Sequence, residues 1–296
     1  EIIDIYRLKL ENNNLSGQIP DEICNLDNLN WSATPDWSMS TLYNNNFCMP
    51  YLSCMEDYMG IQDCNYYPDC PDGYVAINEY CYYDSDLEVL QILINNSTEN
   101  IDMDMDKDGN GVIDPLELGH QQWHQGRITN LDCNWYDTYG SHRCGLAGSI
   151  PSEIGTLTSL TSLDLSWTSY KLSGLIPSEI GNLQNLQYLN LSGNSFTGSI
   201  PPEIGNLTSL ETLEITYNNL SGSIPIEIGN LINLTHLEMS YNNLSGLIPS
   251  EIGNLQNLQY LYLNGNALTG RIPLEVGSMM SLYKLVLNNN QLTGAI

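Results

Sequence analysis

The residues best suited to chemistry lie between positions 106 and 117. Oxygen-bearing side chains alternate with other residues at the start of this run, a glycine follows them, and two carboxylates close it. A glycine permits a tight turn, so the oxygen atoms on either side of it can converge on one point. Converging carboxylate and amide oxygens are the ligands that a hard divalent cation prefers. The residues concerned are Asp106, Asp108, Asn110, Gly111, Asp114 and Glu117.

This spacing matches the twelve-residue calcium loop of an EF-hand. A frame that starts at Asp104 is excluded, because it places Pro115 at the twelfth position, where a carboxylate is needed. We therefore expect Ca2+ as a cofactor; the alternative is a solvated acidic turn. Because regulatory EF-hands usually pair, this lone loop is expected to join domains rather than to sense calcium. The predicted ligands are Asp106, Asp108, Asn110, Val112 through its carbonyl, Asp114 and Glu117.

Helices are expected on both sides of this loop. The segment Ser85-Asp86-Leu87-Glu88 has the form of a capping box and predicts a helix from Asp86 to about Asn95. Pro115 suits the first turn of a second helix, because its missing N–H is harmless there. That second helix would carry Leu116, Leu118 and Trp123 toward the coil that follows.

Catalytic chemistry is not expected. His120 and His124 would share one face of the second helix, but Gln121 stands where a zinc hydrolase needs a glutamate. The four histidines of the chain offer no set of nucleophile, base and orienting group. We therefore predict that the protein is not an enzyme and has no catalytic residues.

The eight cysteines suggest an oxidising compartment, and hence a secreted, extracellular or cell-surface protein. The segment 70–81 predicts two short strands around a turn, closed by its own pair, Cys70 with Cys81. A second local pair is expected between Cys133 and Cys144. The alternative to disulfides is a set of buried free thiols. The remaining four cysteines are expected to pair among themselves within one cap: Cys24, Cys48, Cys54 and Cys64.

The charge of the chain limits its partners. It holds 35 acidic residues against 8 Lys plus Arg, for a net charge of −27. Nucleic acid is excluded, because its phosphates require a basic surface, and cationic partners are favoured instead. No apolar run reaches the length of a membrane span.

A repeat organises the second half of the chain. Ile-Pro recurs from Ile150-Pro151 onward, first after 26 residues and then at intervals of 24. Such a period is typical of a solenoid. Within each repeat, Leu-x-x-Leu-x-Leu points alternate leucines inward from a short strand, and an asparagine follows where the chain must turn. Its amide can pair with backbone groups of neighbouring coils. These asparagines are Asn194, Asn218, Asn242, Asn266 and Asn290.

The consensus Leu-x-x-Leu-x-Leu-x-x-Asn-x-Leu-Ser/Thr-Gly-x-Ile-Pro-x-Glu-Ile-Gly, as in the segment 258–277, resembles the plant-type leucine-rich repeat. The resemblance implies a right-handed superhelix with parallel strands on a concave face, where partners bind. Cys48-x-Pro-Tyr-x-x-Cys54, Cys70-Pro-Asp-Gly-Tyr and the segment 110–119 are similar to secreted leucine-rich-repeat proteins of marine bacteria. That similarity implies an extracellular modular unit.

The expected fold class is an α/β solenoid, a right-handed leucine-rich-repeat superhelix with a Cys-rich cap and an EF-hand insert between two repeat arrays. Residues 1–47 would end a first array, and 48–69 would form the Cys-rich C-terminal cap and linker. Residues 70–126 would form the Cys hairpin and the calcium module that caps the next array. Residues 127–296 would form the second array.

Two functions remain open at this level. Both ends of the chain cut through a repeat, which favours a calcium-stabilised structural or adhesive solenoid that assembles end to end, as a filament or a surface array. The alternative is a monomeric recognition module that binds a glycan or a protein on its concave face, where a merely solvated sheet is also conceivable. The outward positions of its strands that would bind are Asp132, Asp164, Tyr188, Glu214, His236, Glu238, Tyr260 and Tyr262.

Overall fold

The computed structural model describes residues 16–17, 46–47, 70–77, 80–97, 112–137 and 140–294. The chain divides into two compact units. The first unit comprises residues 1–84 and 124–127, and the second comprises 85–123 and 128–296. The expected cap cysteines Cys24, Cys48, Cys54 and Cys64 lie outside the described residues.

The first unit contains a short parallel pair and a disulfide-closed hairpin. Strands β1 (Ser16–Gly17) and β2 (Asn46–Phe47) run parallel. Strands β3 (Tyr74–Ile77) and β4 (Tyr80–Tyr83) run antiparallel. The predicted disulfide between Cys70 and Cys81 closes this hairpin, with an S–S distance of 2.06 Å. The sequence prediction for this segment is confirmed.

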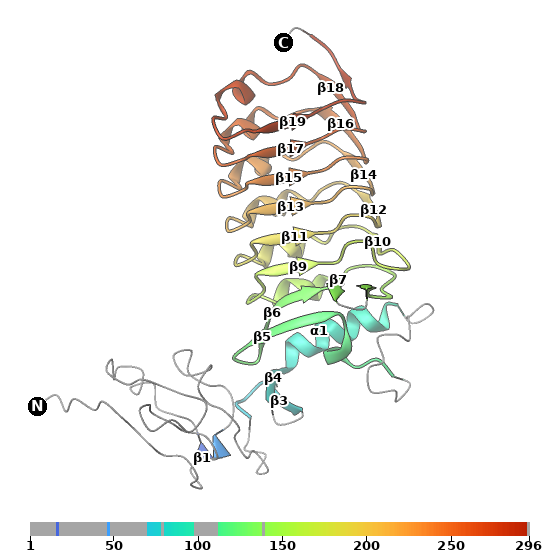
Figure 1. Ribbon diagram of the computed structural model, residues 1–296, viewed down its shortest axis with the longest axis vertical. Helices are drawn as coiled ribbons and strands as arrows, with labels where there is room; N and C mark the ends of the chain where they lie inside the picture. Colours follow the sequence, from blue (N-terminus) through green and yellow to red (C-terminus); the bar gives the residue numbers. More distant parts are fainter. Residues whose placement is uncertain are drawn as a thin grey trace, which may run out of the picture. The chain divides into compact units, whose positions relative to one another are not determined.

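The second unit is a stack of coils (Figure 1). One side of each coil is a short strand, and these strands lie side by side in a sheet whose order, among the described residues, is β19-β17-β15-β13-β11-β9-β6-β5. From β6 to β19 every neighbouring pair is parallel, as the repeat predicts. The strands are β5 (His120–His124), β6 (Arg127–Asp132), β9 (Ser162–Asp164), β11 (Tyr188–Asn190), β13 (Thr212–Glu214), β15 (His236–Glu238), β17 (Tyr260–Tyr262) and β19 (Lys284–Val286).

A second parallel sheet and a row of 3-10 helices form the other sides of the coils. The second sheet consists of β10 (Ser173–Gly174), β12 (Ser195–Gly198), β14 (Asn219–Gly222), β16 (Asn243–Leu247), β18 (Ala267–Gly270) and β20 (Gln291–Leu292). The 3-10 helices are η5 (Ser152–Thr156), η6 (Ser178–Asn182), η7 (Pro202–Asn206), η8 (Ile226–Asn230), η9 (Ser250–Asn254) and η10 (Leu274–Ser278).

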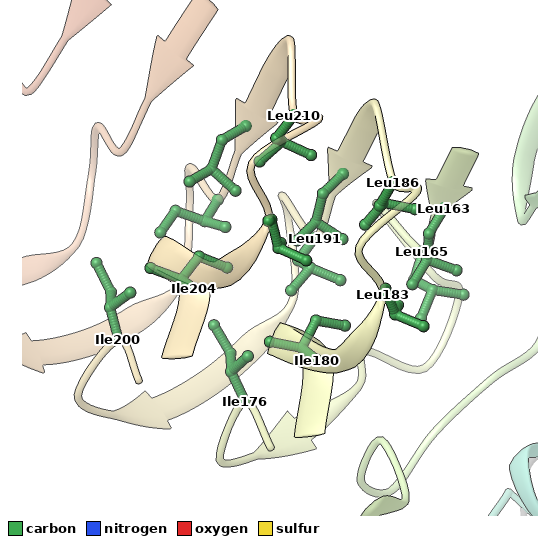
Figure 2. Packing of buried hydrophobic residues seen from close by; sticks show 14 of the residues in the cluster. Leu163, Leu165, Ile176, Ile180, Leu183, Leu186, Leu191, Ile200, Ile204 and Leu210 are labelled. Atoms are coloured by element: carbon green, nitrogen blue, oxygen red, sulfur yellow. The ribbon is translucent and has the colours of Figure 1, made fainter. Parts of the chain in front are cut away.

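Leucine and isoleucine side chains fill the space between the three sides (Figure 2). Leu186, Leu189 and Leu191 are buried, as the alternation within Leu-x-x-Leu-x-Leu predicts. The isoleucines of the Ile-Pro dipeptides and of the 3-10 helices, such as Ile176 and Ile180, close the core from the opposite side. No coil buries its apolar face alone, so each coil depends on its neighbours for stability.

A helix covers the first coil of the second unit. Helix α1 (Asp84–Asn95) buries Leu90 and Leu93 in the same core as the coils. The buried Asp86 accepts a hydrogen bond from the backbone N–H of Ile128 at 2.9 Å. The predicted helix is therefore confirmed, but it begins earlier than expected, so Ser85 lies inside its first turn and cannot act as the cap.

The prediction of a helix after Pro115 is wrong. Only a 3-10 turn, η4 (Pro115–Glu117), forms there, and the chain then enters strand β5. Along β5 the side chains alternate between more exposed and less exposed positions, which is the period of a strand. The free edge of the parallel sheet accounts for the difference, because pairing with β6 satisfies backbone groups that a short helix would otherwise have to satisfy.

The insertion between Cys133 and Cys144 forms a hairpin of its own. Strands β7 (Asn134–Asp137) and β8 (Gly140–Arg143) run antiparallel. The predicted disulfide between Cys133 and Cys144 closes the hairpin at its base. Both cysteines are fully buried in the core, so the pair also packs the first coils of the stack.

Buried or half-buried asparagines join each coil to the one before it. Asn242 is 7 % exposed. Its Nδ2 donates to the carbonyl of Ile215 in the preceding coil at 2.9 Å, and its Oδ1 accepts the backbone N–H of Leu220 at 3.0 Å. Asn194, Asn218, Asn266 and Asn290 repeat this arrangement. The predicted role of the asparagine ladder is confirmed.

Aromatic residues occupy this turn in three coils, directly before Thr168, Asn218 and Asn242. Trp167, Tyr217 and Tyr241 are exposed and adopt positive φ, a conformation that is costly for residues with side chains. The Tyr217 and Tyr241 rings stack with centroids 4.5 Å apart. Between Trp167 and Tyr217 lies Gly193, where any Cβ would overlap the Trp167 indole. Because Gly193 has no side chain, the Trp167 ring lies 5.6 Å from the Tyr217 ring.

Replacing Asn242 with aspartate tests the ladder. A carboxylate can accept from Leu220 but cannot donate to the carbonyl of Ile215. We expect Asn242→Asp to lower the free energy of unfolding by about 2–4 kcal/mol, because a buried charge and an unsatisfied carbonyl are both created. Denaturation in urea measures this loss. The matched control is Asn243→Asp, at an exposed neighbour, and an equal loss in both variants would contradict the role of the ladder.

Candidate functional site

The parallel register places the predicted binding residues in two columns on the outward face of the long sheet. Leucines occupy the strand centres and face the core, so the residues on either side of them face outward. The first column follows the register Asn130, Ser162, Tyr188, Thr212, His236, Tyr260 and Lys284. The second column, called here the acidic column, follows Asp132, Asp164, Asn190, Glu214, Glu238, Tyr262 and Val286.

The acids at the start of the acidic column have a structural task. Asp132 accepts the backbone N–H of Asn134, and Asp164 accepts that of Ser166, each at 2.8 Å. Asn190 makes the equivalent bond to Ser192 at 3.0 Å. These short side chains therefore fix the turn at the end of their own strands.

A hydrogen-bond network joins the two columns across neighbouring coils. The Tyr188 hydroxyl lies 3.4 Å from Asp164 Oδ2, and Asn190 Nδ2 donates to the Tyr188 hydroxyl at 3.1 Å. Asn190 Nδ2 also donates to Glu214 Oε2 at 2.9 Å. The network fixes the Glu214 carboxylate, whereas Glu238 in the next coil is not part of it.

Burial among like charges makes these carboxylates hard to ionise. Burial, together with the neighbouring charges of Glu238 and Asp164, raises the pKa of Glu214 to about 7. Burial also raises the pKa of Asp164, against the hydrogen bonds from Ser166. The pKa of Glu238 is raised by burial too, although His236 and Lys284 oppose the shift. A cationic ligand beside these carboxylates would stabilise their ionised forms and lower their pKa values.

Aromatic groups occupy the far end of the same face. The His236 and Tyr260 rings stack with centroids 4.5 Å apart, and Tyr260 meets the Tyr283 ring edge-on at 5.7 Å. The ammonium group of Lys284 lies 5.1 Å from the centre of the Tyr262 ring. The face therefore changes from acidic near Asp164 to aromatic near Tyr260.

A groove that the sequence analysis missed runs along the starts of the strands. Its volume is about 610 Å³, and its lining is almost wholly amide and hydroxyl. The signal was present in the sequence, because the groove residues recur at the same two positions of the repeat, directly before and after the first leucine of Leu-x-x-Leu-x-Leu. The lining residues are Gln187, Ser209, Glu211, Asn233, Thr235, Asn257, Gln259 and Ser281.

Only part of the predicted calcium loop lies within the described residues. Asp106, Asp108 and Asn110 lie outside them. Of the others, Val112 is exposed, while Glu117 is nearly buried and its Oε2 accepts the backbone N–H of Asp114 at 3.0 Å. No three acidic, histidine or cysteine side chains gather into a metal site within the described ranges. The calcium site stays a prediction, because three of its six ligands lie outside the described residues.

Family comparison agrees with the coil geometry. Residues 143–243 match the family described as Leucine-rich repeat region, and residues 4–26, 233–255 and 257–279 match the family described as Leucine Rich Repeat. The coil stack is therefore a leucine-rich-repeat domain. A comparison with curated proteins returned no match.

Receptor ectodomains are among the similar solved structures. The PEPR1–AtPEP1 structure shares 31% identity over 72% of this chain and 29% of that chain, with a TM-score of 0.61. A second structure is the ectodomain of the plant receptor kinase GASSHO1/SCHENGEN3 from Arabidopsis thaliana, in complex with CASPARIAN STRIP INTEGRITY FACTOR 2. It shares 28% identity over 98% of this chain and 25% of that chain, with a TM-score of 0.53. The Arabidopsis receptor kinase HAESA, in complex with the peptide hormone IDA and the co-receptor SERK1, shares 29% identity over 71% of this chain and 39% of that chain. Its TM-score is 0.54. The chain thus spans 25–39% of their lengths.

Glu214→Gln tests the electrostatics of the acidic column. The pKa of Glu214 is raised from 4.5 to about 7 in the folded protein. The folded state therefore holds more protons than the unfolded state between these values, and stability falls as the pH rises through that window. Glutamine cannot ionise, yet its oxygen can still accept from Asn190.

We expect Glu214→Gln to raise the melting temperature by about 2–4 °C at pH values near 8, for a screened effect of about 1 kcal/mol. Near pH 4.5, the ordinary pKa of this carboxyl, the variant and the parent should melt alike. Calorimetry at both pH values provides the measurement. A gain that is independent of pH would show that packing, not charge, causes it.

Proposed function

We propose that this chain is an extracellular recognition module and that its acidic column binds an extended, cationic peptide segment. The observation that carries the proposal is the set of carboxylates Asp164, Glu214 and Glu238, which lie in register on the outward face of one sheet. Burial is the main cause of their raised pKa values, so their ionised forms are costly until a positive charge lies beside them. Arginine or lysine side chains of a partner would supply the missing charge.

The spacing of the column favours an extended partner. Neighbouring strands in a sheet lie about 4.8 Å apart. Glu214 and Glu238 belong to adjacent strands, and Asp164 lies two strands away from Glu214. Alternate side chains of an extended peptide are about 6.6–7 Å apart. Basic residues at every second or third position can therefore reach successive carboxylates while the peptide crosses the coils.

Two further features support an extracellular location. The described disulfides, Cys70 with Cys81 and Cys133 with Cys144, are typical of oxidising compartments. The similar structures include the receptor kinase HAESA in complex with the peptide hormone IDA. None of the helices in the described ranges combines the length and the apolar character that a membrane crossing needs. The proposed role of this chain as a peptide-binding module follows from its own carboxylates, and the neighbours support it.

A binding experiment tests the peptide proposal. We expect a labelled peptide of alternating Arg and Gly to bind, and one of alternating Glu and Gly not to bind, by fluorescence anisotropy. Because ionised Glu214 is needed and its pKa is about 7, the affinity should fall about tenfold between about pH 8 and about pH 5.5. The double variant Glu214→Gln with Glu238→Gln should bind about tenfold more weakly at pH 8.

The matched control changes two acids of the same coils outside the column. Glu203→Gln with Glu227→Gln removes the same net charge from the 3-10 helices η7 and η8. This control should bind the Arg-Gly peptide as the parent does. Equal losses in both double variants would reduce the effect to net charge and would falsify the assignment of the site to the acidic column.

We also propose that Ca2+ occupies the loop from Asp106 to Glu117, as the ligand spacing indicates. The expected result is a higher melting temperature with Ca2+ than with EDTA, and loss of that difference in Asp106→Asn with Glu117→Gln. Magnesium at the same concentration is the control ion.

End-to-end assembly is a separate proposal for the calcium-loaded chain. Sedimentation velocity of that sample should show species larger than a monomer. A single sharp monomer peak would contradict assembly.

A further inference from the structure

We propose that the groove along the starts of the strands is a second binding site, for a neutral linear oligosaccharide. It is distinct from the acidic column in position and chemistry. Its lining comes from five successive coils, from Gln187 in the coil of β11 to Ser281 in the coil of β19. A groove of about 610 Å³ is within the usual range for a small-molecule site.

The lining is unusual for a protein with a net charge of −27. Glu211 is the one ionisable residue among those that line the groove. Amides and hydroxyls provide the rest, and each of these groups can both donate and accept hydrogen bonds. Sugar hydroxyls have the same dual capacity. A cationic peptide would find little charge here, whereas an oligosaccharide would find partners of matching polarity.

Some of the groups in the groove are held in place by the fold. Asn233 Nδ2 donates to the carbonyl of Thr208 at 2.8 Å, and Asn257 Nδ2 donates to that of Ile232 at 2.9 Å. These bonds fix the side chains, so that each Oδ1 is presented as an oriented acceptor. The Thr235 hydroxyl is likewise fixed by the carbonyl of Glu211 at 2.9 Å. Groups that are already ordered lose little entropy when a ligand binds.

Other groups in the groove are available for a ligand. The side-chain amides of Gln187 and Gln259 are exposed, and the hydrogen bonds found among the described residues do not involve them. They belong to the coils of β11 and β17, with two coils between them. Together they offer donors and acceptors at two separate points along the groove, which suits a chain of sugars better than a single sugar.

Aromatic rings adjoin the groove. The Thr235 hydroxyl lies 2.9 Å from Nδ1 of His236, and the His236 ring stacks on the Tyr260 ring. Tyr260 directly follows Gln259 of the groove. Sugar rings carry apolar C–H faces beside their hydroxyls, so a site with amides and adjacent aromatic rings can contact both parts of a sugar.

The repeat of the coils matches the repeat of the ligand. Parallel strands lie about 4.8 Å apart, which is close to the length of one pyranose unit in an extended chain. A linear oligosaccharide that runs across the coils can therefore place one unit on each coil. Branched or strongly bent glycans would lose this match after one or two coils.

The test measures binding of cellohexaose, xylohexaose and mannohexaose to the full chain by isothermal titration calorimetry. We expect at least one of the three to bind, and the double variant Gln187→Ala with Gln259→Ala to weaken that binding about tenfold through the loss of two or more hydrogen bonds. The matched control is Gln184→Ala, which removes an exposed glutamine of the same coil that does not line the groove. Hexagalacturonate, which is anionic, should bind more weakly than the neutral chains.

The two proposed sites can be separated in one set of proteins. The glutamine double variant should still bind the Arg-Gly peptide with the affinity of the parent. The double variant Glu214→Gln with Glu238→Gln should still bind the oligosaccharide. The inference is overturned if none of the three neutral hexasaccharides binds. It is also overturned if binding survives the glutamine changes or is lost with the acidic residues instead. Neither failure would affect the peptide proposal, which is measured with a different probe.

Discussion

Backbone polar groups at the turn of each coil impose the constraint on which this fold depends. The turns are buried between coils, where water cannot satisfy their carbonyl and N–H groups. Asn218 illustrates the solution: its amide donates to the carbonyl of Leu191 and accepts from the N–H of Phe196, both in the preceding coil. One residue thus satisfies two groups and fixes the offset between coils. That offset sets the register of the strands, and the register in turn aligns every outward column.

Sequence periodicity therefore predicted much of the architecture. The leucines at Leu-x-x-Leu-x-Leu positions are buried, the ladder asparagines bridge coils, and two local cysteine pairs form disulfides. Each of these features depends on residues close in sequence or separated by a whole repeat. Because a solenoid makes contacts mainly between neighbouring coils, such short-range patterns carry most of its three-dimensional information.

Features that depend on the ends of the stack were harder to predict. Pro115 indicated a helix by its local preference, but the following residues form β5 by pairing with the free edge of the sheet.

On the outward face, residue type alone did not reveal which acids bind the backbone. Asp132 and Asp164 accept hydrogen bonds in the turns after their own strands, whereas the Glu214 carboxylate accepts a hydrogen bond from Asn190. Side-chain length decides this difference, since an aspartate reaches a backbone N–H two residues on.

The ring of Trp167, which reaches past Gly193 to Tyr217, makes the coils at this point of the array unequal. Repeats of equal length are often assumed to be interchangeable, so that unequal recombination can add or remove one without damage. Loss of the coil that contains Gly193 would bring Trp167 directly against the following tyrosine, and duplication of that coil would leave the indole without a partner ring. A change in the number of coils at this point would therefore alter the surroundings of the indole as well as the length of the stack.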